Sequence, residues 1–298
     1  MTTIPWLWAV FTIIAAAAQT VRNATQRELT AKLGTVGATH VRFLFGLPFA
    51  LIFLAGVTLV TGAGLPRPPL VFWPWVLAGA LLQIAATALM LAAMGERSFV
   101  VAIAYIKTEP IQVALFGLVF LGDHVTPLMA VAILIATMGV TLMSLKRGAQ
   151  SGGLKPMLLG LSAGAGFALS AIGYRGAILS LHDPSFVIAA TYSLVVGLVL
   201  QTALLTGYLL ARQRAVLIAI FRSWRPSLFA GFMGALASQF WFLGFATASA
   251  ASVRTLALVE VLFAQAISRF VFKQPVSARE GVGIVLIVAG VALLVWAY

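Results

Sequence analysis

Apolar runs of about 20 residues recur along the whole sequence and restrict the chain to a membrane fold. A run of this length crosses the hydrocarbon core as an α-helix, because the backbone must satisfy its hydrogen bonds internally. Only 9% of the residues are charged, against about 25% in soluble domains. We predict an all-α integral membrane protein with ten transmembrane helices. The expected spans lie near residues 5–21, 36–61, 72–94, 98–120, 127–145, 156–174, 185–210, 227–246, 251–271 and 279–297.

The two halves of the sequence align with each other without a gap when one is shifted by 151 residues. This shift places Glu109 on Glu260, the two acidic residues that lie well inside spans. Internal similarity marks a repeated unit, and five spans per unit make the second copy insert upside down. We therefore expect a five-helix repeat at 1–147 and an inverted five-helix repeat at 156–298, with a substrate site near the bilayer midplane. Chance register between two apolar segments is the alternative.

The basic residues are distributed unevenly between the connections. The chain carries 19 Lys and Arg against 7 Asp and Glu, and most of the basic residues follow odd-numbered spans. Because Lys and Arg favour the cytoplasmic side, we expect both termini on the extracytoplasmic side of a bacterial inner membrane. The longest connection, 211–225, has the pattern of an amphipathic helix at the membrane surface. A nucleic-acid partner is not expected, since it requires a basic face on a soluble fold.

Several polar residues are assigned to connections or span ends. Arg22 is placed in the first connection and Arg175 in the connection after the sixth span. Arg42 and His40 lie near the end of the second span, where long side chains reach the headgroups; a position at the mouth of a cavity is the alternative. Asp123 is placed in a solvated turn.

Four charged residues lie inside spans: Lys107 and Glu109 in the fourth, and Arg254 and Glu260 in the ninth. Charge in a membrane interior is costly, and such residues usually face a cavity or pair with one another. We interpret all four as candidate substrate-binding groups in a central cavity. The alternative is that the four residues form two ion pairs with a purely structural role. Pro110 is expected to kink the fourth span beside Glu109.

Polar and aromatic neighbours extend the candidate substrate-binding set. Tyr105, Glu109 and Gln112 share one face of a continuous helix. Gln239 and Trp241 lie in the eighth span. Amides in a bilayer interior face the bundle or a cavity, so interhelical hydrogen bonding is the alternative for each glutamine.

Nothing in the sequence predicts catalysis. There is no Cys, and the three His are not at metal-ligand spacing. The nucleotide-binding, serine-hydrolase and zinc-protease motifs are absent. We expect no enzyme, no catalytic residue, no cofactor and no metal. The expected partners are a small-molecule substrate, the lipid bilayer and, in a coupled mechanism, protons, and the expected state is a monomer or homodimer.

Short motifs follow the glutamate of the first expected repeat. They read Glu109-Pro110, then Phe120-Leu121-Gly122-Asp123, then Gly139-Val140 near the end of the fifth span. This order resembles the EamA-type branch of the drug/metabolite transporter superfamily, which shows Glu-Pro, Phe-Leu-Gly-Glu and Gly-Val. The second half departs from it, with Glu260-Val261 and Phe272-Lys273-Gln274 in the corresponding places. The resemblance implies ten helices in two inverted repeats and secondary transport.

The resemblance and the charged residues together predict a function. We expect a secondary active transporter that exports a small polar or zwitterionic, amino-acid-like metabolite by alternating access. Glu109 and Glu260 would bind an amine or exchange protons, and Lys107 and Arg254 would hold a carboxylate. The alternative substrates are an anionic or phosphorylated metabolite bound by Lys107 and Arg254, or a quaternary amine. A non-transporting membrane subunit and a lipid scramblase are the alternatives outside transport.

Overall fold

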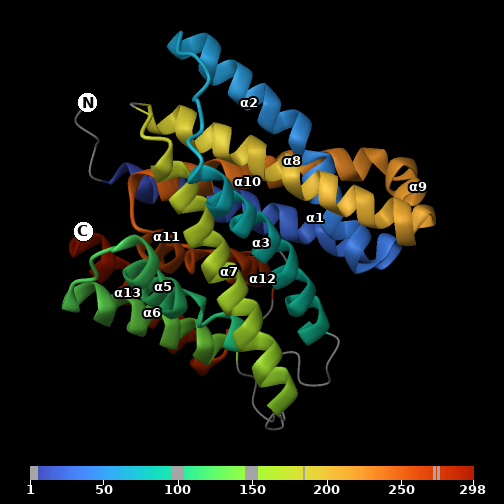
Figure 1. Cartoon of the computed structure of the whole chain (residues 1–298). Helices are drawn as coiled ribbons and strands as arrows, with labels where there is room; N and C mark the ends of the chain where they lie inside the picture. Colours follow the sequence, from blue (N-terminus) through green and yellow to red (C-terminus); the bar gives the residue numbers. More distant parts are fainter. Residues whose placement is uncertain (1–5, 95–103, 145–153, 184, 271–272, 274–275) are drawn as a thin grey trace.

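The computed structural model describes residues 6–94, 104–144, 154–183, 185–270, 273 and 276–298, and every regular element among them is a helix (Figure 1). The expected all-α integral membrane fold is confirmed, because nine stretches of the described chain are long and apolar enough to cross a membrane. The exact count of ten stays a prediction, since the expected span at 5–21 is not among the nine. The helices are α1 (Leu7–Leu44), α2 (Gly46–Thr61), α3 (Phe72–Met94), α5 (Glu109–Leu121), α6 (Pro127–Ser144), α7 (Leu154–Ser180), α8 (Phe186–Arg212), α9 (Arg214–Arg222), α10 (Trp224–Thr247), α11 (Ala250–Leu256), α12 (Val259–Phe270) and α13 (Ala278–Trp296).

Helix α1 consists of two helical parts that meet at Gly34. This glycine has φ 67° and ψ 178°, a backbone conformation that is essentially restricted to glycine. The helix therefore continues past the expected end of the first span, and most of the expected first connection is helical. The part after Gly34, together with α2, forms the second expected span within Lys32–Thr61.

The helices pack in three main pairs, namely α3 with α7, α1 with α10 and α6 with α13 (Figure 1). When the sequence is shifted by 151 residues, α3 falls on α10 and α1 falls on α7, so the first pair corresponds to the second. The same shift places α6 on α13, the two members of the third pair. This is the pairing that a two-fold relation between the halves would produce. The repeat boundaries at 147 and 156 stay a prediction, and most of the connection between them lies outside the described residues. The rings of Trp8 and Tyr298 pack against each other at a tilt of 47° with their centres 4.8 Å apart, so α1 begins where α13 ends.

Helices α6 and α13 cross with their backbones in contact. A Cβ added to Gly139 would lie 2.7 Å from the carbonyl oxygen of Gly283. A Cβ added to Gly290 would lie 2.6 Å from the backbone nitrogen of Ala136. Small residues permit this close approach, which dispersion forces and weak backbone contacts then stabilise. The crossing therefore depends on glycine at both positions.

Replacing Gly290 with valine should lower the stability of the protein by about 1–3 kcal/mol, the usual cost of overpacking. The backbone of α6 cannot move away without opening the crossing. Thermal unfolding of the purified protein in detergent measures this loss. Gly281→Val is the matched control on the same helix, because nothing lies within 4 Å of a Cβ at Gly281. Equal losses in the two variants would show that helix propensity, and not the crossing, determines the effect.

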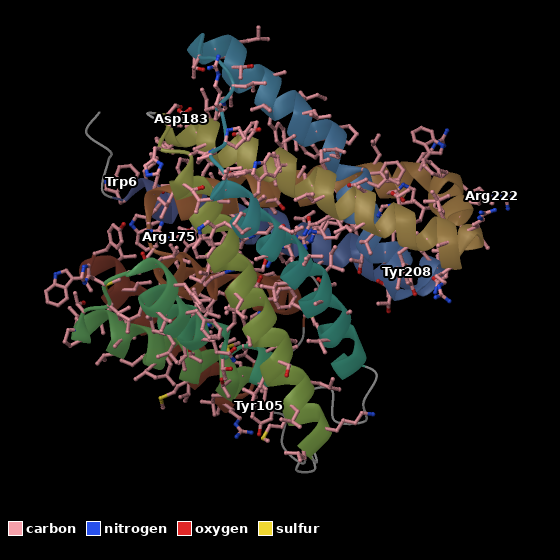
Figure 2. The ribbon with its side chains drawn as sticks, viewed as in Figure 1. Trp6, Tyr105, Arg175, Asp183, Tyr208 and Arg222 are labelled. Atoms are coloured by element: carbon pink, nitrogen blue, oxygen red, sulfur yellow. The ribbon has the colours of Figure 1, made fainter. Side chains whose placement is uncertain are left out.

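Arg175 connects three parts of the fold, and its expected position in a connection is wrong. It lies within α7, and Figure 2 shows it at the left side of that helix. Its guanidinium donates to Asp123 Oδ1 at 3.1 Å, to the Phe245 carbonyl at 2.6 Å and to the Ala248 carbonyl. Asp123 is 11% exposed and not a solvated turn residue. A cation at the last carbonyls of α10 also suits the negative end of that helix.

Arg22, His40 and Arg42 also lie inside the bundle and not at the headgroups. Arg22 is 7% exposed and His40 is fully buried. His40 Nε2 lies 3.0 Å from the Thr206 hydroxyl oxygen. Arg42 lines an internal cavity of about 10 Å³ together with Tyr174. The assignments of Arg22 to a connection and of His40 and Arg42 to the membrane surface are therefore wrong.

Candidate substrate site

The fourth expected span is interrupted beside its charged residues. Residues 104–106 are helical, Lys107 and Thr108 form a turn, and α5 begins at Glu109. Pro110 occupies the first turn of α5, where its missing N–H removes no helical hydrogen bond. The expected kink beside Glu109 is confirmed.

The ninth expected span is interrupted at nearly the corresponding place. A turn at Ala257–Leu258 separates α11 from α12, and the Glu260 N–H donates to the Ala257 carbonyl at 3.0 Å in a tight turn. Val261 stands where the fourth span has its proline, so proline does not cause this second interruption. Glu109 and Glu260 each lie in the first turn of the following helix. The positive end of a helix favours a carboxylate there.

A cavity of about 50 Å³ lies between the two interruptions. All four predicted intramembrane charges line it. The cavity is large enough for water but much smaller than the roughly 300–1,000 Å³ of ligand pockets. It must therefore widen before it admits a metabolite. The lining residues are Gln19, Lys107, Glu109, Pro110, Arg254, Ala257, Leu258 and Glu260.

Glu260 is held by hydrogen bonds to both of its carboxylate oxygens. Lys107 Nζ donates to Oε1, and Gln19 Nε2 donates to Oε2 at 2.7 Å. Trp241 Nε1 donates to Gln19 Oε1 at 3.2 Å. Gln19 is the residue of this site that sequence reasoning missed. The network joins α1, α10 and α12 to the turn before α5.

Glu109 pairs with Arg254 in a looser arrangement. Glu109 Oε1 lies 3.2 Å from Arg254 Nε, but neither atom has an aligned hydrogen bond within the described chain. The Arg254 guanidinium carbon lies 5.2 Å from the centre of the Trp241 ring and 5.6 Å from that of Phe245. The aromatic rings orient the cation and leave its donors available. This pair therefore has hydrogen-bonding capacity that Glu260 lacks.

The other predicted site residues do not line the cavity. Gln112 Nε2 donates to Thr108 Oγ1 at 3.1 Å, and Gln239 Nε2 donates to Thr191 Oγ1 at 2.7 Å. Tyr105 lies before the turn and near the lower end of the bundle in Figure 2. The face that it was expected to share with Glu109 requires an unbroken helix. The structure thus brings the four charges together, with Trp241 beside them.

Two interrupted helices that meet around a charged cavity in an apolar helical bundle are features of membrane transporters. Residues 6–145 match the model of the EamA-like transporter family. This match places the protein in the drug/metabolite transporter superfamily as a membrane transporter, and it confirms the resemblance seen in the motifs. One solved structure, described as the crystal structure of a protein, matches with a TM-score of 0.71 over 97% of this chain and 99% of that chain. At 15% identity it shows the fold alone. No curated protein sequence matches the chain.

Proposed function

We propose that this transporter exports an amino-acid-like zwitterion across the bacterial inner membrane by alternating access. The observation that carries the proposal is the pairing of Glu109 with Arg254 in the cavity. An ammonium group fits the carboxylate of Glu109, and a carboxylate fits the forked guanidinium of Arg254. A zwitterion supplies both groups within one small molecule.

The difference between the two ion pairs assigns them different roles. Glu260 has partners on both oxygens, so a ligand must break existing hydrogen bonds to reach it. Glu109 and Arg254 keep atoms without aligned partners among the described residues. We assign ligand binding to Glu109 and Arg254, and the holding of the resting state to Lys107 and Glu260. Proton exchange at either carboxylate would couple export to the proton gradient.

The distribution of basic residues supports the proposed orientation. Figure 1 shows α9 at the end of the bundle opposite the chain termini. Helix α9 begins at Arg214 and ends at Arg222, and basic residues favour the cytoplasmic side. This arrangement supports the proposed extracytoplasmic position of both termini.

A transporter of anionic or phosphorylated metabolites is the second candidate. The observation that favours it is that both cations, Lys107 and Arg254, line the same cavity. In this case the substrate would displace Glu109 and Glu260 from the two cations.

A ligand screen with the purified protein separates these candidates. We expect amino acids to raise the apparent melting temperature, since a ligand at 100 times its Kd stabilises the native state by about 2.7 kcal/mol. The same compounds should then move across liposomes that contain the protein. Stabilisation by sugar phosphates alone would favour the anion transporter. Equilibration of labelled lipid without any solute movement would contradict solute transport and favour a scramblase.

A further inference from the structure

Two arginines of α1 lie together inside the bundle, outside the central cavity lining. Arg22 precedes the break at Gly34 and Arg42 follows it. Both side chains pass over Gly234 of α10. A Cβ added to that glycine would lie 3.3 Å from Arg42 Cγ and 3.5 Å from Arg22 Cδ. Glycine at this position therefore leaves the space that the two side chains share.

The pair has donors but few acceptors. Arg22 is 7% exposed, and its Nη2 donates to Asn23 Oδ1 at 2.8 Å. Arg22 Nε, Arg22 Nη1 and Arg42 Nε are buried without a hydrogen-bond partner among the described residues. Among the described residues, the Glu260 carboxylate attracts Arg22 electrostatically. Both of its oxygens are bonded to Lys107 and Gln19.

Buried donors and buried positive charges each cost free energy unless an acceptor or an anion compensates them. The two neighbouring side chains each carry a guanidinium with forked donors, a geometry that suits the oxygen atoms of a carboxylate or phosphate. We propose that Arg22 and Arg42 form an oxyanion-binding site between α1 and α10, separate from the Glu109–Arg254 pair. The ligand is the carboxylate or phosphate group of a soluble metabolite.

The site lies next to the central cavity. Gln19, which lines that cavity, is three residues before Arg22 on α1, so both project from neighbouring turns of one helix face. Provided that the proposed transport holds, the site is a second resting position for the acidic group of the substrate. It lies between the central cavity and the end of the bundle at Gly34, the proposed cytoplasmic side.

Inorganic phosphate and succinate are the probes that test this site. Each is added to the purified full-length protein in detergent and compared with sodium chloride at equal ionic strength. At least one should raise the apparent melting temperature by about 2 °C or more above the chloride value. The probe that acts identifies the chemistry as phosphate or carboxylate. A wild-type protein that responds to neither probe beyond chloride would overturn the proposal.

Four variants show which arginines are responsible for the shift in melting temperature. Arg22→Gln and Arg42→Gln should abolish the shift and, without a probe, should melt at or above the wild-type temperature. Each removes a charge inside the bundle that has no salt bridge with the described residues. Arg222→Gln is the matched control and should keep the shift, since Figure 2 shows Arg222 at the outer end of the bundle. Arg254→Gln should keep it too. If Arg254→Gln loses the shift while Arg22→Gln retains it, the anion binds in the central cavity. That result overturns this site and leaves the proposed transport standing.

Discussion

Replacing Lys107 with methionine should destabilise the protein by about 3 kcal/mol, because it leaves the Glu260 carboxylate in the bundle without its cation. We expect the low end of the usual range for buried pairs, since the Lys107 and Glu260 side chains are 25% and 17% exposed. Thermal and denaturant unfolding in detergent measure the change.

The double variant Lys107→Met/Glu260→Gln is the control that isolates the charge. It removes both charges and keeps an amide that Gln19 can bond, so it should recover most of the lost stability. A double variant that is less stable than Lys107→Met would mean that the carboxylate has another role. Arg214→Gln, at an exposed position at the start of α9, should leave stability nearly unchanged.

Glu109→Gln should weaken the binding of a zwitterionic substrate by about 10–100-fold, because a hydrogen bond to a charged group contributes about 1.5–3 kcal/mol. Glutamine preserves the shape of the side chain and removes its charge. Ligand titrations and the initial rate of transport in liposomes measure the effect. The loose pairing with Arg254 predicts only a small loss of stability in the same variant.

Glu280→Gln is the matched control for this substitution. Glu280 forms a capping box with Ser277 at the start of α13, and glutamine serves equally well in that motif. Binding should be unchanged in this variant. If Glu109→Gln binds normally while Arg254→Gln and Lys107→Met do not, the substrate is an anion and the zwitterion proposal fails.

Much of the fold was predictable because a membrane restricts the backbone to few solutions. Apolar length alone identified the spans from residue 36 onward, apart from their internal breaks. The acidic residues Glu109 and Glu260 stood out for the same reason, since a carboxylate in an apolar run needs a compensating partner. Pro110 marked one interruption. The turn at Ala257–Leu258 carries no such mark, because it depends on the packing around it.

The main difference between the prediction and the structure concerns the positions of charged residues inside long helices. A hydropathy pattern ends a span at an arginine, whether that arginine faces water or the bundle interior. The pattern therefore predicts connections at Arg22 and Arg175, although both lie within helices and make buried contacts. Only the residues that contact the arginine in the folded protein distinguish these two cases. The carbonyls of Phe245 and Ala248 that bind Arg175 are backbone atoms, which leave no trace in the side-chain pattern.

Gln19 was missed for a related reason. It is a neutral amide near the end of an expected span, and neither hydropathy nor charge distinguishes it from its neighbours. Its importance arises from Glu260 and Trp241, which lie far away in the sequence and reach it only after folding. One feature of the sequence does point to Gln19. It lies three residues before Arg22, on a helix that continues further than its hydropathy suggests.

The glycine crossing of α6 and α13 limits how this transporter can move. Two helices in backbone contact cannot slide along each other without collision, and they lose the contacts of the crossing when they separate, so they should behave as a fixed pivot. The motion that admits a solute must then take place elsewhere, by bending at the turns Lys107–Thr108 and Ala257–Leu258. A cross-link between α6 and α13 should accordingly leave transport unaffected, whereas one across the two turns should stop it.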